Sequence, residues 1–314
     1  MTFPKKTALL LAALVLVVPL SSCDGKDPNK LYVTGPYFTD YEAKDVYNAY
    51  LGSSISTLNS AKSQSATDVR HLANFVDGLV MNNEFGILER QLASSASVNT
   101  EYTQFDFTIK QNIPWFTYDG AQYVAKNTEG QDVPQVVKAD DFVNTAEIIL
   151  NYANESEIAY MVTMFIDGGW EYYCYTEMLK LIKDRNTNYA GINWMTLKSA
   201  SNDAKATALM TLIAYESGMD PIDVPLILGE DLESIANFSR VGVKATSEYG
   251  IQYRLNQPAR FFPTLLTYAP FYPINRAFFS QHKFAGFGTS KEKLLYNGPY
   301  LCSEWSDQSP IHPQ

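Results

Sequence analysis

Apolar residues recur every three to four positions in several parts of the chain, which is the pattern of helices that bury one face. The clearest example spans 67–80, and Thr67 or Asp68 is placed to cap its first turn. Another helix is predicted from Lys138 to about Tyr152, with an aspartate as its N-cap. Weaker patterns predict further helices at 40–51, 260–268, 275–281 and over most of 155–237, with interruptions at Gly168-Gly169 and Asp220-Pro221.

Strand patterns lie between these helices. In 86–126, Phe105, Phe107 and Ile109 alternate with polar residues, and Tyr118-Asp119-Gly120 supplies a turn, so this region is predicted to form antiparallel strands. Three shorter segments are also predicted, namely a strand at 31–34, a hairpin of 240–244 with 250–255, and a segment at 297–305 that begins as a turn and continues as a strand. The fold class is therefore α/β, in the sense of a mixed α+β fold.

The first residues have the layout of a secretory signal. Lys5 and Lys6 precede an apolar stretch from Ala8 to Leu20, which as a helix would rise about 20 Å, too short for a hydrocarbon core of about 30 Å. Leu20-Ser21-Ser22-Cys23 resembles the lipobox of bacterial lipoproteins. We therefore expect residues 1–22 to be a signal peptide, Cys23 to be lipidated and 23–30 to be a tether. The alternative is an ordinary signal peptide with an incidental cysteine.

The remaining chain is acidic and poor in cysteine. Removing residues 1–22 removes two lysines and no acid, so the net charge changes from -10 to -12, which argues against binding of nucleic acid. Cys174 and Cys302 are too few for a disulfide framework, and we expect two buried thiols, although a single pair stays open. No later apolar run is long enough to span a membrane, so the chain after Cys23 should fold outside the cytoplasm.

Enzyme signatures are absent from the sequence. There is no nucleophile elbow, no phosphate-binding glycine loop and no zinc-protease helix, and only His71, His282 and His312 could serve a metal site or a catalytic triad. The adjacent acids Asp140 and Asp141 would point about 100° apart on a helix, so capping explains them better than a catalytic pair. We therefore expect no enzymatic activity, no cofactor and no metal.

A series of short sequence motifs in a fixed order resembles the extracytoplasmic oligopeptide-binding proteins of ABC importers, known as solute-binding protein family 5. The resemblance covers roughly 55–150 and 238–305. The main motifs are Phe75-Val76-Asp77-Gly78-Leu79-Val80, Phe105-Asp106-Phe107-Thr108-Ile109-Lys110, Lys138-Ala139-Asp140-Asp141-Phe142-Val143, Arg240-Val241-Gly242-Val243-Lys244-Ala245 and Asn297-Gly298-Pro299-Tyr300.

The resemblance implies a periplasmic-binding-protein-like fold of the cluster C type. Residues 31–84 and 238–314 would then belong to the first lobe, and 85–237 would form the inserted small subdomain. Family members continue well beyond the position of Trp305 to build a second lobe. We therefore expect this chain to be a truncated form that lacks that lobe.

The resemblance also implies a function. The chain would be a lipoprotein on the extracytoplasmic face of the bacterial cell membrane that captures oligopeptides for an ABC permease. By position, the ligand contacts of the first lobe fall on Lys62, Ser63, Gln64 and Ser65 and on Asn297, Gly298 and Tyr300. A dipeptide, a signalling peptide or another small solute stays open as the ligand. The alternative function is a surface lipoprotein that uses part of this fold for protein contacts, as an adhesin or a chaperone-like partner.

Overall fold

A computed structural model describes residues 54–228 and 233–305. Its helices are α2 (Ala66–Phe75), α3 (Ala139–Leu150), α4 (Ala159–Thr163), α5 (Gly169–Lys183), α6 (Trp194–Leu197), α7 (Asn202–Ser217), α8 (Val224–Leu228), α9 (Phe262–Leu265) and α10 (Arg276–Gly286). Its strands are β1 (Val80–Asn82), β2 (Leu88–Arg90), β3 (Ala93–Val98), β4 (Gln104–Ile109), β5 (Val124–Lys126), β6 (Asp132–Pro134), β7 (Val243–Ser247) and β8 (Gly250–Arg254). Cys23 and the elements predicted at 31–34 and 40–51 lie outside the described residues.

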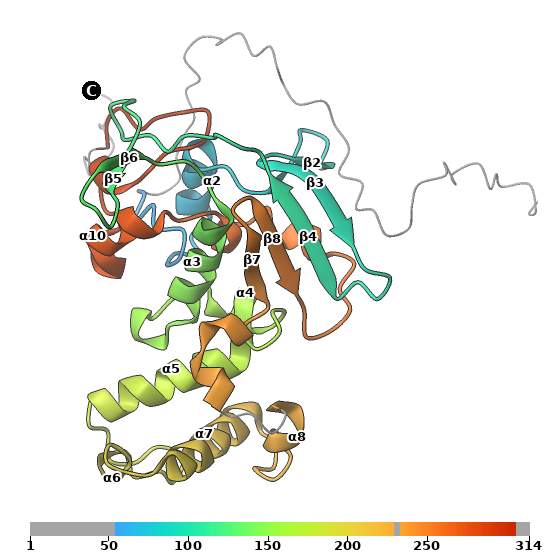
Figure 1. The fold of residues 1–314 in the computed structure, drawn as a ribbon, viewed down its shortest axis with the longest axis vertical. Coiled ribbons are helices and arrows are strands. Elements are labelled where there is room, and N and C mark those ends of the chain that lie inside the picture. The colour runs from blue at the N-terminus through green and yellow to red at the C-terminus, as the bar shows by residue number, and fades with distance from the viewer. Residues whose placement is uncertain (1–53, 229–232, 306–314) are drawn as a thin grey trace, which may run out of the picture.

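A four-stranded antiparallel sheet brings together two distant parts of the chain (Figure 1). Its order is β3-β4-β8-β7, and Phe107 lies opposite Ile251 in the register of β4 and β8. The predicted alternation is confirmed, since Phe105, Phe107 and Ile109 are buried and the residues between them are not. The predicted hairpin is also confirmed as β7 and β8, although its first strand begins at Val243.

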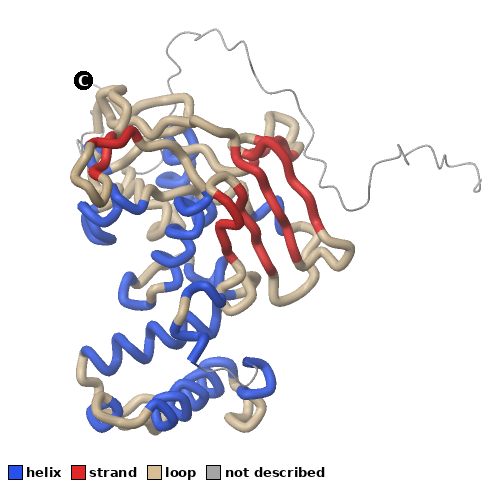
Figure 2. The backbone as a smooth tube through the Cα atoms, viewed as in Figure 1, coloured by secondary structure: helices blue, strands red, loops and turns tan. Residues whose placement is uncertain are grey.

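Two separate hydrophobic cores hold the chain together. The larger core joins the sheet to α2, α3, α9 and α10, and Phe105, Phe142 and Phe262 lie at its centre. The smaller core lies inside the helical unit of α5 to α8, around Trp194 and Leu212. Figure 2 shows the same division, with helices and loops alone in the lower part of the molecule. None of the helices in the described ranges is both long and apolar enough to cross a membrane.

The helix predicted at 67–80 is shorter than expected. It begins after Ser65, whose hydroxyl accepts the N–H of Asp68, so the predicted caps Thr67 and Asp68 are wrong. It ends at Phe75, and Val76 is already extended. The physical reason lies in distant side chains, because the N–H of Asp77 donates to Asn297 Oδ1 and the next N–H donates to Gln91 Oε1. These donors would otherwise have continued the helix.

Three other predictions concern α3, the segment 297–305 and the two cysteines. The helix at 138–152 is confirmed as α3, but its N-cap is Lys138 and the aspartate Asp141 lies at the third helical position, so the predicted aspartate N-cap is wrong. The strand predicted within 297–305 is also wrong, since this segment is irregular and its first N–H groups donate to the end of α2. Cys174 and Cys302 are both free and buried, which confirms the expected pair of buried thiols.

Candidate functional site

The predicted ligand residues lie at opposite ends of α2. The loop Lys62–Ser65 leads into the N-terminus of this helix, and the turn Asn297–Tyr300 contacts its C-terminus. A helix of this length spans about 15 Å. The structure therefore brings each segment to α2 but does not bring the two segments into contact with each other.

The loop is folded by a buried carboxylate. Asp68 accepts the backbone N–H of Ser56 at 2.8 Å and the hydroxyls of Ser56 and Ser63 at 2.5 and 2.7 Å. Ser63 Oγ in turn accepts the N–H of Ser65 at 3.0 Å. The two predicted serines are thus engaged in folding the loop, while the side chains of Lys62 and Gln64 are exposed and available to a ligand.

A cleft of about 450 Å³ lies beside this loop, within the usual range of ligand pockets. Its lining residues are mostly hydroxyl-bearing, with one aliphatic and one indole side chain, and they are Ser54, Ile55, Ser56, Thr289, Ser290 and Trp305. The two walls are joined at Gly288, whose carbonyl accepts the N–H of Leu58 at 2.8 Å and the hydroxyl of Thr57 at 3.2 Å. These two bonds hold the walls together at one end of the cleft.

Sequence reasoning missed this cleft, and it also missed the role of Asp68. The cleft walls come from residues 54–56 and 289–305, and no local pattern joins segments so far apart in sequence. One signal for Asp68 does exist, because Ser65 followed by Asp68 has the spacing of a capping box. In the structure the Asp68 carboxylate instead accepts hydrogen bonds from the hydroxyls of Ser56 and Ser63.

The turn at 297–300 is built on the end of α2. The N–H groups of Asn297 and Gly298 donate to the Phe75 carbonyl at 3.2 and 2.9 Å, and the N–H of Tyr300 donates to Asn74 at 3.1 Å. A Cβ on Gly298 would lie 2.8 Å from the Phe75 carbonyl carbon, so this close approach requires glycine. The Tyr300 side chain is left about half exposed at the surface.

The side-chain amide of Asn297 has its oxygen paired and its nitrogen unpaired. It is 9% exposed, and its Oδ1 accepts the N–H of Asp77 at 2.9 Å. Its Nδ2 is buried without a hydrogen-bond partner among the described residues. A buried donor left unpaired costs about 1–3 kcal/mol, so this nitrogen is a place where an added acceptor would stabilise the chain.

Asp77 belongs to a buried polar cluster next to this turn. Gln91 Nε2 donates to Asp77 Oδ1 at 2.6 Å. Burial raises the pKa of Asp77 to about 7, although nearby Lys110 acts in the opposite direction. Burial and the proximity of Arg90 lower the pKa of Lys110 to about 8. Both groups therefore titrate close to neutral pH.

Stability should fall as the pH rises through the Asp77 transition. The folded pKa is raised from 3.8 to about 7, so the native state keeps a proton that the unfolded chain has released. This contribution is full below the unfolded pKa and is lost as the pH rises through the folded one. We expect a higher melting temperature at about pH 5 than at about pH 8, and a smaller difference in Asp77→Asn, which keeps an acceptor for Gln91. An unchanged difference in the variant, measured by calorimetric melting, would contradict this role.

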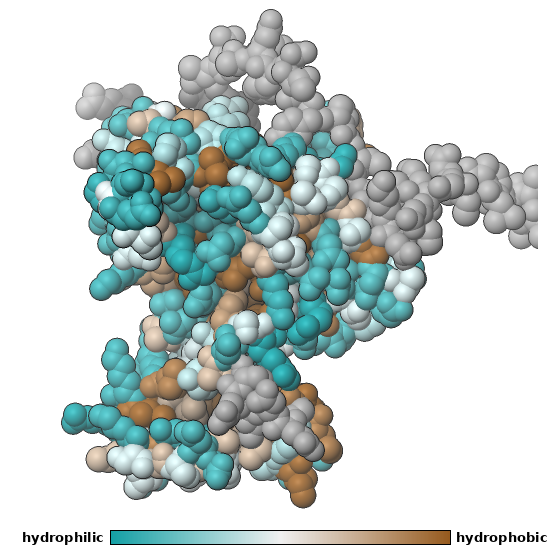
Figure 3. All heavy atoms as spheres, in the orientation of Figure 1, coloured by the Kyte–Doolittle hydropathy of each residue, from teal (hydrophilic) through white to brown (hydrophobic). Residues whose placement is uncertain are grey.

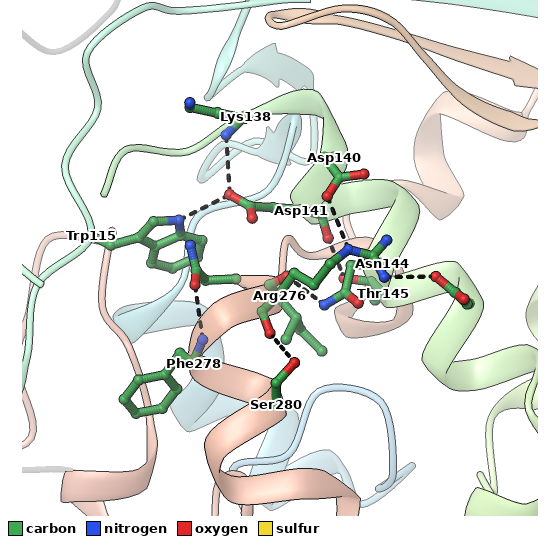
Figure 4. Close-up of polar contacts among 12 residues, drawn as sticks. Trp115, Lys138, Asp140, Asp141, Asn144, Thr145, Arg276, Phe278 and Ser280 are labelled. Atoms are coloured by element: carbon green, nitrogen blue, oxygen red, sulfur yellow. Dashed lines mark hydrogen bonds and ion pairs between the residues drawn. The ribbon is translucent and has the colours of Figure 1, made fainter. Parts of the chain in front are cut away.

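A second polar network joins the N-termini of α3 and α10 (Figure 4). Asp141 accepts the indole N–H of Trp115 at 3.0 Å and the N–H of Lys138 at 3.1 Å, and burial raises its pKa to about 6. Arg276 donates to Asp140 at 3.0 Å and to Glu147 at 2.9 Å. The two adjacent acids thus point to different partners, which fits capping and packing and not paired acid chemistry.

This network borders a second cleft, of about 300 Å³, between the starts of α3 and α10. Its charged lining groups, among them Asp140, Asp141 and Arg276, are already bonded to one another or to neighbouring protein groups. They have little remaining capacity for a ligand, so we assign this region to the folding of the chain. Within the described residues, no three histidine, cysteine or acidic side chains come together as a metal site.

Comparisons with known proteins find similar sequences and similar folds. No protein-family model matches it. It is similar to the oligopeptide-binding protein SarA of Streptococcus gordonii, with 26% identity over 273 residues, which is 86% of this chain and 30% of that protein. The chain is thus similar in sequence to proteins that are named for oligopeptide binding. The oligopeptide-binding protein AmiA of Streptococcus pneumoniae is also similar, with 25% identity over 87% of this chain and 31% of AmiA.

Two solved structures share the fold of this chain. An oligopeptide ABC transporter substrate-binding domain from Bacillus anthracis matches with a TM-score of 0.53 and 18% identity, covering 84% of this chain and 36% of that one. A periplasmic oligopeptide-binding protein from Borrelia burgdorferi gives a TM-score of 0.53 and 15% identity, covering 81% and 35%. The predicted mixed, periplasmic-binding-protein-like fold is confirmed. The chain spans about 30% of the length of the curated relatives, and the predicted domain boundaries stay a prediction.

Proposed function

We propose that this chain captures oligopeptides outside the cell for an ABC-type importer. The observation that carries the proposal is the match over 86% of the chain to a protein named for oligopeptide binding. The shared fold supports it. The net charge is also compatible, because an acidic chain is poorly suited to bind nucleic acid.

We place the peptide in the cleft lined by Ser54–Ser56, Thr289, Ser290 and Trp305. Its hydroxyls can exchange hydrogen bonds with a peptide main chain directly or through water, and the Trp305 indole offers rigid apolar contact area. The exposed side chains of Lys62 and Gln64 stand on the adjoining loop. The turn Asn297–Tyr300 would contribute a second contact, about one helix length away. An extended peptide of roughly five residues reaches this far, at about 3.3 Å per residue.

Titration calorimetry on the full chain with a mixture of short peptides tests the proposal. We expect saturable heat of binding, because main-chain hydrogen bonds with roomy side-chain sites give broad specificity. A folded chain that gives no binding heat would contradict peptide capture. That result would favour the alternative of a surface protein that contacts other proteins.

The membrane anchor and the transport partner are part of the same proposal. We propose that Cys23 is acylated and holds the chain on the extracytoplasmic face of the cell membrane, close to the permease subunits that would receive the peptide. The support is the sequence Leu20-Ser21-Ser22-Cys23 after an apolar signal. Mass spectrometry of the mature N-terminal peptide from cells tests it, and an unmodified Cys23 would contradict the anchor.

A further inference from the structure

Three large aliphatic side chains are exposed together at the far end of the helical unit. Ile222, Leu226 and Ile227 are 76%, 82% and 57% exposed. Figure 3 shows hydrophobic residues gathered at the end of the molecule where α8 lies in Figure 1. A single exposed aliphatic side chain is ordinary, but a group of them on one short segment of a soluble surface indicates a contact site.

The local backbone holds two of these side chains on one side. The N–H of Asp223 donates to the Asp220 carbonyl at 2.9 Å, and the N–H of Leu226 donates to the Asp223 carbonyl at 3.2 Å, so the turn continues directly into α8. Ile222 and Leu226 are therefore about one turn apart and neighbours on the surface. Val224, one of the buried residues of α8, fixes the helix to the smaller core. The apolar side chains thus lie on or next to a helix, α8, that is anchored to the smaller core.

The exposed charges beside Ile222 are acidic, whereas Arg240 lies at the C-terminal end of α8, where it donates to the Leu228 carbonyl at 2.9 Å and lines a pocket with Ile227. Every charged residue between Lys205 and Arg240 is acidic. Asp220 and Asp223 flank Ile222 and are exposed, and no ion pair within the described residues neutralises either carboxylate. A partner that covered the apolar group would therefore bring it into a negative field, which favours a basic surface and disfavours an anionic membrane.

We propose that Ile222, Leu226 and Ile227 form a docking surface for a protein segment that offers apolar side chains surrounded by lysine or arginine. The apolar side chains would supply the affinity, because removing exposed aliphatic surface from water favours binding. Asp220 and Asp223 would supply orientation and selectivity against acidic partners. This surface lies in the helical unit, away from the cleft assigned to peptides, and the proposal does not depend on peptide capture.

The test uses a synthetic amphipathic helix of leucine and lysine as the probe, titrated into the full chain. A peptide of the same composition, shuffled so that its leucines form no face, is the control probe. We expect saturable binding of the amphipathic peptide and at least about tenfold weaker binding by the double variant Ile222→Ser, Leu226→Ser. The matched control is Phe85→Ser, Ile87→Ser, which removes side chains that are 77% and 49% exposed elsewhere.

The charged residues give a second readout. Asp220→Asn, Asp223→Asn should make binding less dependent on salt, and the asparagine at 220 keeps an acceptor for the Ile222 N–H. Melting curves confirm that the variants are folded. The proposal is overturned if the amphipathic peptide does not bind, if both double serine variants lose affinity equally, or if the shuffled peptide binds as tightly. It is also overturned if the chain binds phosphatidylglycerol vesicles through Leu226 in preference to the peptide.

Discussion

Gly288→Ala is expected to lower the free energy of unfolding by more than about 3 kcal/mol. Gly288 has a φ of +68°, a conformation that costs an L-residue about 1–2 kcal/mol. A Cβ at this position would lie 2.3 Å from the backbone nitrogen of Asn59 and 2.5 Å from the carbonyl carbon of Leu58. Since both neighbours are backbone atoms, no side-chain rotation relieves the clash. The two walls of the cleft would have to separate, and the hydrogen bond from Leu58 to Gly288 would be lost.

The matched control for this substitution is Gly86→Ala. Gly86 also has a positive φ, of +74°, but nothing lies within 4 Å of a Cβ built there. It should therefore cost only the backbone strain, about 1–2 kcal/mol. Urea unfolding of both variants separates the cost of backbone strain from the cost of the steric clash. Equal losses of stability at the two positions would mean that the cleft walls are not held together as described.

Asp68→Ala is expected to cost about 3 kcal/mol or more and to release the loop Lys62–Ser65. The carboxylate is buried and accepts three hydrogen bonds from Ser56 and Ser63. Hydrogen bonds to charged groups contribute about 1.5–3 kcal/mol each, and alanine would leave their donors buried without partners. Asp68→Asn keeps one acceptor oxygen and should lose less stability than alanine.

Asp119→Ala serves as the control for this loss. Asp119 also accepts two local hydrogen bonds, from the Thr117 hydroxyl at 2.6 Å and the Ala121 N–H at 3.2 Å, but it is exposed. Water can replace those bonds, so the cost should stay below about 1 kcal/mol. Denaturant unfolding measures stability, and limited proteolysis reports on the loop. If the Asp68 and Asp119 variants were equally stable, Asp68 would not organise this region.

The local sequence pattern was enough to predict elements that pair with a nearby segment, and strands whose buried and exposed residues alternate strictly. The alternation of Phe105, Phe107 and Ile109 predicted β4, and the two runs before and after a polar turn predicted the β7–β8 hairpin. The end of α2 could not be predicted in this way. Val76 continues the apolar period, but the donors that follow it are captured by Gln91 and by Asn297, which lies 220 positions away.

The candidate site could be predicted only in part from the sequence, for the same reason. The resemblance to a family predicted the loop and the turn as ligand contacts, but which side chains point inward depends on contacts within the fold. Ser63 is used internally by Asp68, whereas Lys62 next to it is exposed. The cleft arises only when residues 54–56 meet 289–305, and that meeting rests on the backbone of Gly288.

The most direct test of peptide capture is to repeat the calorimetric titration on Trp305→Ala. Trp305 is the largest side chain lining the cleft, and tryptophan is the residue whose truncation most often removes binding energy. Tyr160→Ala, at an exposed position on α4, is the control. We predict that the unchanged chain and the Tyr160 variant bind peptides with the same affinity, and that the Trp305 variant binds at least about tenfold more weakly. Equal affinity in all three proteins, or no binding by the unchanged chain, would contradict the proposed site.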